Sequence, residues 1–236
     1  MKLALIGCGA MGKLVANLAD AAGDEIGSKV TSDDASKDAV QLSTGLRGHD
    51  AAIDFSAGSA VLRNIEACAL AGVPLVEGTT GWHEQEAQAR RLVEDHQGAL
   101  VYGANFSIGV NIFYRIVANA ARLMAGLDQY QAFMEEEHHV RKRDAPSGTA
   151  LKLKDLITEH IKTEIPIASV RAGHIPGTHR VGFDLNADQI MLTHMARSRE
   201  GFAAGALLAA RWIVGRKGVY EFSDLIDEIL KNSAEV

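Results

Sequence analysis

The fold is decided by LALIGCGAMGKL, residues 3–14. Its first four residues form a short apolar run, which is typical of a buried strand. The glycines follow at G-x-G-x-x-G spacing, and Leu14, Val15 and Leu18 then recur at helical spacing. Because a strand, a tight turn and a helix in this order are what the dinucleotide fingerprint requires, the stretch predicts a dinucleotide-binding unit.

The glycine-rich turn is expected to hold the pyrophosphate of such a cofactor. Glycine permits a tight turn and close backbone approach, and the amides at a helix N-terminus attract negative charge. The alternative is a turn whose glycines serve packing only. The cofactor residues predicted from this turn are Gly7, Cys8, Gly9, Ala10, Met11 and Gly12.

The preference between NADH and NADPH stays open. An acidic residue that binds the ribose is expected about 20 positions after the turn, where the sequence reads Thr31-Ser32-Asp33-Asp34. The carboxylates fall one or two positions late, and Ser32 could accommodate a 2′-phosphate with help from Lys29 or Lys37. Ser32 is therefore included among the candidate cofactor residues.

Two different patterns divide the chain. Apolar runs alternate with helical patterns in its first part, which predicts a parallel sheet covered on both faces; the strands are expected at residues 3–6, 25–30, 51–55, 74–77 and 99–102. Residues 33–50 show only a hint of helix at 39–42. Beyond residue 111 helices are expected at 112–124, 147–162, 202–214 and 221–231, and strands at 130–134, 168–171, 181–185 and 189–194.

These patterns predict an α/β fold with two domains. The first is a dinucleotide-binding (Rossmann) parallel-sheet domain made of residues 1–107 and 203–236. The second, residues 108–202, is an α+β domain with a mixed or antiparallel sheet.

Composition excludes several classes of partner. The 236 residues carry a formal net charge of −6, which gives no electrostatic reason to expect nucleic acid or an anionic membrane. Glycines interrupt the N-terminal apolar run before it could form a signal-peptide core or span a bilayer. Cys8 and Cys68 have no paired spacing, so a reducing, cytoplasmic compartment is expected.

The segment with the most residues suited to proton transfer and anion binding is a basic loop, EHHVRKRDAPSGTA, residues 137–150. Ser147 is a plausible N-cap, and free amides at Gly148 and Thr149 would then bind a carboxylate. A histidine and a lysine nearby can supply protons. The alternative is a solvated surface loop. No metal is expected, because adjacent histidines point apart and no carboxylate has ligand spacing.

The same loop carries a resemblance to a known family. Residues 138–150 match H-H-x-x-K-x-D-x-P-S-G-T-A without a gap, and further matches occur in order: D-F-S at 54–56, G-T-T-G at 78–81, A-N-F-S-x-G-V-N at 104–111, R-x-G-x-x-x-G-x-H at 171–179 and S-R-x-x-F-A-x-G-A at 198–206. With these motifs the chain resembles the dihydrodipicolinate reductase family over essentially its whole length.

The resemblance implies roles for particular residues. His138 would act as general acid or base and Lys142 as proton donor, with substrate contacts from His139, Ser147, Gly148 and Thr149. The nicotinamide end of the cofactor would be held by Gly78, Thr79, Thr80, Ala104, Asn105, Phe106 and Ser107. The roles of Arg171, His179 and Arg199 stay open.

The resemblance also implies a reaction and an assembly. A small dicarboxylate, 4-hydroxy-tetrahydrodipicolinate, would be reduced with NADH or NADPH on the diaminopimelate route to lysine. The enzyme would be a homotetramer, in which the second domain, residues 108–202, serves substrate binding and oligomerisation. Two alternatives stay open. One is another two-domain amino-acid or semialdehyde dehydrogenase, which the glycine-rich turn fits equally well. The other is a dinucleotide sensor without catalysis, which the presence of both His138 and Lys142 disfavours.

Overall fold

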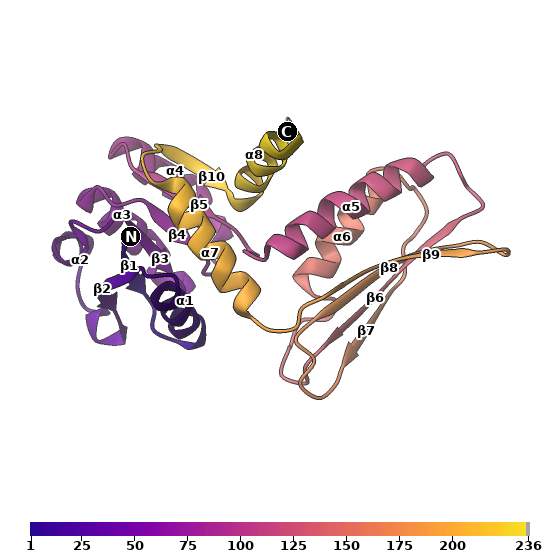
Figure 1. The fold of residues 1–236 in the computed structure, drawn as a ribbon, viewed down its shortest axis with the longest axis horizontal. Coiled ribbons are helices and arrows are strands. Elements are labelled where there is room, and N and C mark those ends of the chain that lie inside the picture. Colours follow the sequence, from indigo (N-terminus) through magenta and orange to yellow (C-terminus); the bar gives the residue numbers. More distant parts are fainter. Residues whose placement is uncertain (235–236) are drawn as a thin grey trace. The chain divides into compact units, whose positions relative to one another are not determined.

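The computed structural model describes residues 1–234 and divides into two compact units (Figure 1). Unit 1 consists of residues 1–108 together with the chain from residue 200 onward, and unit 2 consists of residues 109–199. Residues 235–236, which the expected first domain includes, lie outside the described residues. No helix in the described chain is both long and apolar enough to cross a bilayer.

Unit 1 is built on a six-stranded parallel sheet in the order β10-β5-β4-β3-β1-β2. The strands are β1 (Lys2–Ile6), β2 (Glu25–Val30), β3 (Ala51–Asp54), β4 (Leu75–Glu77), β5 (Ala99–Tyr102) and β10 (Gly218–Glu221). Parallel strands covered on both faces need apolar side chains at successive positions. Leu3, Ala4, Leu5 and Ile6 meet this need, each at most 2% exposed.

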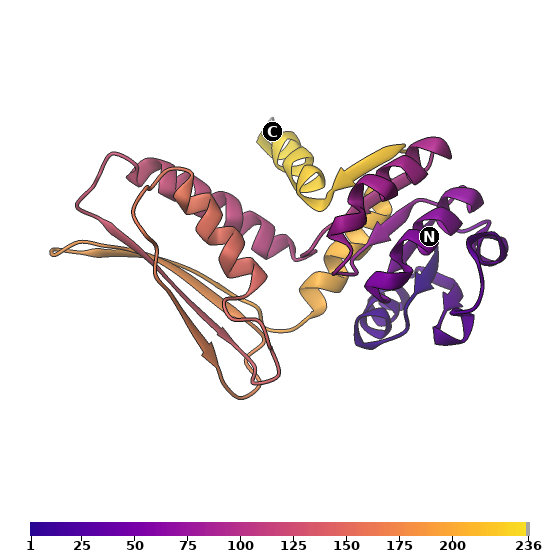
Figure 2. The same ribbon diagram turned by 180° about the vertical axis from the view of Figure 1, so that it is seen from behind.

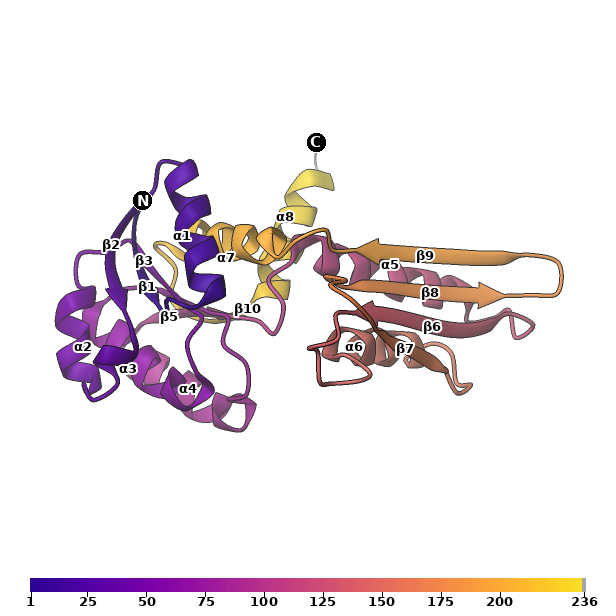
Figure 3. The same ribbon diagram turned by 90° about the horizontal axis from the view of Figure 1, so that it is seen from below.

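Helices cover both faces of this sheet (Figure 3). α1 (Ala10–Ala21) and α7 (Glu200–Ile213) pack together on one face, and α2 (Ala39–Leu46), α3 (Val61–Ala71) and α4 (Glu86–Asp95) lie on the other. α8 (Phe222–Ala234) follows β10 and buries Phe222, Leu225 and Ile226. Short 3-10 helices occupy Ser32–Asp34, Gly58–Ala60 and His83–Gln85.

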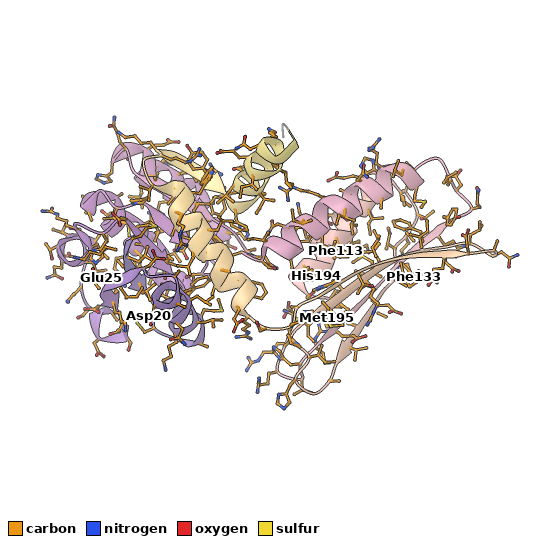
Figure 4. The ribbon with its side chains drawn as sticks, in the orientation of Figure 1. Asp20, Glu25, Phe113, Phe133, His194 and Met195 are labelled. Carbon is orange, nitrogen blue, oxygen red and sulfur yellow. The ribbon has the colours of Figure 1, made fainter. Side chains whose placement is uncertain are left out.

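Unit 2 is a four-stranded mixed sheet in the order β7-β6-β8-β9. β6 (Gln131–His138) pairs in parallel with β7 (Ile167–Arg171) and antiparallel with β8 (Thr178–Asp184), which pairs antiparallel with β9 (Gln189–Met195). Two helices, α5 (Ile108–Met124) and α6 (Gly148–Thr158), lie along one face, as Figure 2 shows from behind. Phe113 of α5 and His194 of β9, labelled in Figure 4, meet in this layer with ring centroids 5.8 Å apart.

The bounds of several expected elements differ from those observed, and three differences are informative. β6 runs to His138, so ending this strand at residue 134 was wrong. It continues because Glu136 and His138 alternate onto the buried face, like Ala132 and Met134 before them. The helix expected at 147–162 ends at Thr158. β10 was not expected, because four residues carry too little pattern, and its pairing with β5 comes from a distant part of the chain.

Candidate active site

The first candidate site lies at the carboxyl ends of the parallel strands in unit 1. A cavity of about 350 Å³ opens there, where dinucleotides bind in sheets of this type. The glycine-rich turn, the turn after β3 and the turn after β4 form its walls. Its lining residues are Gly9, Ala10, Met11, Phe55, Ser56, Gly58, Gly78, Thr79 and Thr80.

The three glycines of the fingerprint have different surroundings. A Cβ on Gly7 would lie 2.4 Å from the Phe55 carbonyl oxygen, and one on Gly12 would lie 2.0 Å from the Gly7 carbonyl oxygen. These two glycines serve packing between turn, strand and helix. A Cβ on Gly9, by contrast, would meet no described atom within 4 Å. The protein itself therefore does not require glycine at position 9, whereas a ligand approaching the backbone would.

The start of α1 adds an electrostatic reason for an anion here. Gly9 is the N-cap of α1, with no side chain capping the helix and no acidic residue in its first turn. The first amides of a helix and its dipole favour a negatively charged group at this end. The open space at Gly9 and the uncapped helix together fit the pyrophosphate of a dinucleotide.

The other predicted cofactor residues are placed differently. Within the described chain, Gly7, Cys8, Gly12, Ser32 and residues 104–107 are not among the residues that line the cavity. Phe106 is only 2% exposed and packs against Phe222, with ring centroids 4.7 Å apart. Lys37, expected to help with a 2′-phosphate, forms an ion pair of 2.7 Å with Asp34.

The second candidate site is a buried cluster in unit 2 centred on Glu136, whose side chain is fully buried. Oε1 of Glu136 accepts hydrogen bonds from the Ser147 amide at 3.0 Å, Ser169 Oγ at 2.8 Å and Arg171 Nη2 at 2.6 Å. Burial alone raises the pKa of Glu136, but these hydrogen bonds outweigh it and bring the pKa to about 2. Glu136 is therefore a carboxylate at any physiological pH.

The other oxygen of Glu136 faces two histidines. Oε2 lies 3.2 Å from Nδ1 of His138 and 3.8 Å from Nε2 of His179. The two rings meet edge to face with centroids 5.1 Å apart, and His179 Nε2 lies 3.2 Å from Ser147 Oγ. Burial lowers the pKa of both rings, to about 4 for His179, and the charge of Glu136 opposes this shift at each.

This arrangement selects one nitrogen of His138 for chemistry. A carboxylate beside Nδ1 favours the tautomer that carries its proton there, which leaves Nε2 as the nitrogen that exchanges protons. Gly177 makes room at that end of the ring, because a Cβ on Gly177 would lie 3.0 Å from Nε2. Nδ1 of His138 and Oε2 of Glu136 are both buried without a hydrogen-bond partner among the described residues, so the carboxylate acts on the imidazole through its charge at 3.2 Å. The cluster thus places a largely buried imidazole beside a fixed negative charge, which suits a general acid or base.

The basic loop is only partly as expected. Ser147 is the N-cap of α6, with its Oγ accepting a hydrogen bond from the Ala150 amide at 3.2 Å. The pKa of Asp144 is lowered chiefly by the hydrogen bond from Lys142 and to a smaller extent by the Gly148 amide, so a carboxylate already faces the start of α6. The expected carboxylate site at Gly148 and Thr149 stays a prediction. Lys142 Nζ lies 2.9 Å from Asp144 Oδ1. The half-buried His139 follows β6 and is not part of the Glu136 cluster.

Four members of this cluster were not assigned from the sequence: Glu136, Ser169, Arg171 and His179. Glu136 could have been found from the period of two, because it stands two residues before His138 on the same face of a strand. Arg171 and His179 come from other strands, and only folding brings them to Glu136.

Glu136 also bears on the expectation that no metal binds. The ligand atoms of Glu136, His138 and His179 lie within 4.8 Å of one another, so the sequence argument overlooked a carboxylate at ligand spacing. However, Arg171 already contacts Glu136, and buried His179 Nδ1 has no hydrogen-bond partner among the described residues, unlike the second nitrogen of most metal-bound histidines. The absence of a metal stays a prediction.

Comparison with known proteins identifies the family. Two family models match, described as dihydrodipicolinate reductase, N-terminus, over residues 1–106 and dihydrodipicolinate reductase, C-terminus, over residues 109–226. The 4-hydroxy-tetrahydrodipicolinate reductase of Christiangramia forsetii is 36% identical, covering 98% of this chain and all of the relative. The enzyme of the same name from Archaeoglobus fulgidus is also 36% identical, covering 96% of this chain and all of the relative.

A solved structure shares the fold. Dipicolinate-bound dihydrodipicolinate reductase from Paenisporosarcina superposes with a TM-score of 0.73 at 22% identity, covering 94% of this chain and 97% of the other. The family models match both units, and the two relatives are matched over their full length. The chain belongs to the dihydrodipicolinate reductase family.

Proposed function

We propose that this protein reduces 4-hydroxy-tetrahydrodipicolinate to tetrahydrodipicolinate, with NADH or NADPH as reductant, on the diaminopimelate route to lysine. The observation that carries the proposal is the buried Glu136–His138 pair at the start of the loop that matches the family. It provides an oriented proton-transfer group beside cationic side chains, as reduction of an anionic ring requires.

The cavity in unit 1 is the proposed cofactor site. Its open face at Gly9 and the uncapped start of α1 would hold the pyrophosphate. The turns at Ser56 and at Gly78, Thr79 and Thr80 complete the lining and would position the rest of the cofactor. When bound, the nicotinamide supplies the hydride. Residues 104–107 remain candidates for its nicotinamide end.

The loop after β6 is the proposed substrate site, with contacts from His139, Ser147, Gly148 and Thr149. A carboxylate already interacts with this segment, because Lys142 Nζ lies 2.9 Å from Asp144 Oδ1 and the Gly148 amide also lowers the pKa of Asp144. These donors can therefore bind a carboxylate group. A dicarboxylate substrate that reaches Lys142 and Gly148 would displace Asp144 from them.

In the proposed reaction the substrate gains one hydride and one proton and loses one molecule of water. The hydroxyl group leaves as water, hydride adds to the resulting conjugated ring, and a proton completes the reduced product. We assign proton transfer to His138 through Nε2 and to Lys142 through Nζ. The carboxylate of Glu136 lies beside Nδ1 of His138, and an ion pair with Arg171 fixes the Glu136 side chain. A dianionic substrate beside His138 would raise the pKa of the ring and so populate its protonated form, which has a proton on Nε2 to donate.

The assembly proposed for the protein is a homotetramer that forms through unit 2. Large apolar side chains are exposed on its outer strands: Val170, Ile190, Met191 and Met195. Light scattering on the purified protein measures the subunit number directly. Both cysteines are free, which supports a reducing, cytoplasmic location.

The reaction is tested by identifying its product. The hydroxylated substrate is unstable enough that it is best made in situ by the synthase that precedes the reductase. Mass spectrometry should then show a product that has lost one oxygen relative to the substrate, formed only when reduced cofactor is present. An amino-acid or semialdehyde dehydrogenase would leave this substrate unchanged.

A further inference from the structure

Two carboxyl groups for which the proposed reaction has no role lie next to the cofactor cavity. Asp54 ends β3 and Glu77 ends β4, and the two residues pair across these parallel strands. Both side chains are fully buried. They come directly before the two turns that contribute Phe55, Ser56, Gly78 and Thr79 to the cavity lining.

The hydrogen-bond donors to this pair are all neutral. Asp54 accepts from the Ser56 amide and from Asn64 Nδ2, each at 2.7 Å, and Glu77 Oε1 accepts from the Thr79 amide at 2.7 Å. Arg63 contacts Asn64 Oδ1 rather than either carboxyl group. In the described chain no ion pair joins Asp54 or Glu77 to a cation. Two buried negative charges without a cation are strongly unfavourable, so the pair retains a proton.

The proton belongs mainly to Glu77. Asp54 accepts from three donors, including Thr79 Oγ1 at 3.4 Å, and these stabilise its negative charge. Oε2 of Glu77 is buried and has no hydrogen-bond partner among the described residues. Burial, and then the charge of Asp54, raise the pKa of Glu77 well above its usual range, and burial also raises the pKa of Asp54.

The groups around the pair provide no compensating positive charge. Cys68 of α3 is buried nearby, and burial together with the charges of Asp54 and Glu77 raises the pKa of its thiol. On the neighbouring strand, Tyr102 is the register partner of Glu77, and burial raises the pKa of its hydroxyl. That hydroxyl bonds to Glu86 and Arg90 instead, at 2.7 and 2.9 Å.

Hydrogen bonds connect the pair to the cavity wall. Thr79 bonds both carboxyl groups, through its amide to Glu77 and through Oγ1 to Asp54. The Ser56 amide bonds Asp54 and also lies 3.0 Å from Thr79 Oγ1. Ser56 and Thr79 both line the cavity. Any change in the charge of the pair therefore acts directly on two turns of the proposed cofactor site.

We propose that the Asp54–Glu77 pair retains one proton, carried mainly by Glu77, and positions the Ser56 and Thr79 turns, so that loss of this proton weakens cofactor binding. The inference rests on the proposed cofactor site. Asp54 and Glu77 are positioning residues, because they act through Ser56 and Thr79 rather than by touching the cofactor.

The direction of the pH effect follows from the coupling between cofactor binding and proton binding. An anionic cofactor binds better when the pair carries one negative charge than when it carries two. Binding therefore favours the protonated form, and the affinity falls as the pH rises through the titration of Glu77. For a single linked proton the dissociation constant rises by at most about tenfold per pH unit.

The test is a titration of NADH and NADPH into the whole protein from about pH 6 to about pH 10, a range that includes the pKa of about 8–9 that buried glutamates can reach. The wild type should lose affinity at the alkaline end. Glu77→Gln, which imitates the protonated form, should keep the affinity of the wild type at low pH and lose most of the pH dependence. Glu94→Gln, an exposed carboxylate on α4 of the same unit, is the matched control and should behave as the wild type.

Proton uptake is a second measurement that needs no variant. Calorimetry in buffers of different ionisation enthalpy should show the wild type taking up a proton as the cofactor binds at alkaline pH. Asp54→Asn removes the charge that raises the pKa of Glu77, so it should move the loss of affinity to lower pH. An affinity of the wild type that is independent of pH, or the same pH dependence in Glu77→Gln, would overturn the inference alone. Failure of the wild type to bind either cofactor at any pH would overturn the proposed function as well.

Discussion

Oε2 of Glu136 lies 3.2 Å from Nδ1 of His138, and both side chains are on the buried face of β6. The period of two in a strand puts them there, and Arg171 and Ser169 from β7 hold the other oxygen of Glu136. The carboxylate is thus fixed before any substrate arrives. Its negative charge beside Nδ1 favours the tautomer that carries the proton there, as the carboxylate of a catalytic triad does for its histidine.

Replacement of Glu136 should therefore impair the reaction without removing any group that touches the substrate. Glu136→Gln is expected to lower kcat by about 10- to 100-fold, which is less than the roughly 10²–10⁴-fold that a general acid or base contributes, because His138 itself remains. The charge of Glu136 raises the pKa of His138, so the limb of the pH–rate profile that reports His138 should move to lower pH. Glu135→Gln, on the opposite face of the same strand, is the control. An unchanged profile in Glu136→Gln would exclude this positioning role.

Loss of either proton-transfer residue should separate binding from turnover. His138→Gln and Lys142→Ala are each expected to lower kcat/KM by about 100-fold or more while the dissociation constant for the cofactor stays the same. Steady-state kinetics and cofactor fluorescence measure the two quantities. Full activity in both variants would contradict the assigned roles, and wild-type protein without turnover would favour a sensor.

The glycine-rich turn allows a matched pair of substitutions. A Cβ on Gly9 meets no described atom, so Gly9→Ala should fold with an unchanged Tm but raise the cofactor Kd by about tenfold or more, or roughly 1.4 kcal/mol. A Cβ on Gly12 would lie 2.0 Å from the Gly7 carbonyl oxygen, so Gly12→Ala should destabilise the fold by about 1–3 kcal/mol. Equal cofactor affinity in Gly9→Ala and wild type would argue against pyrophosphate binding at this turn.

His179 should make the fold sensitive to mild acid. Its pKa falls from 6.5 to about 4 on folding, so the unfolded chain binds more protons between these values. The stabilisation is complete above pH 6.5 and is lost as the pH falls toward 4. His179→Gln should flatten the dependence of Tm on pH within this window, because glutamine does not titrate. The same slope in the variant and the wild type would show that another group is responsible.

The sequence predicted best those features that depend on residues close together in the chain. The strand, turn and helix of residues 3–14 follow from consecutive residues, and so does the N-cap at Ser147, because caps and turns depend on near neighbours. The end of β6 was missed because Glu136 and His138 are polar. Polar side chains can be buried there only because residues of β7 and β8 interact with them, and the local sequence does not show those residues. Similarly, β10 is too short to show a period by itself.

The buried polar groups could not be located for the same reason. Arg171 lies 35 residues from Glu136 in sequence, and His179 lies on another strand, so no spacing rule connects them. The distinct surroundings of Gly7, Gly9 and Gly12 also depend on Phe55 and on the path of the backbone after β3. Asp54 and Glu77 end two apolar strands, and only the register of β3 and β4 shows that they form a pair.

The most direct test of the account follows the absorbance of NADH and, separately, of NADPH in the presence of substrate made in situ by the preceding synthase. We predict oxidation of at least one cofactor that depends on the substrate and is lost in His138→Gln. The ratio of the two rates then ranks the cofactors. No oxidation of either, by folded protein that binds a dinucleotide, would contradict the proposed reaction.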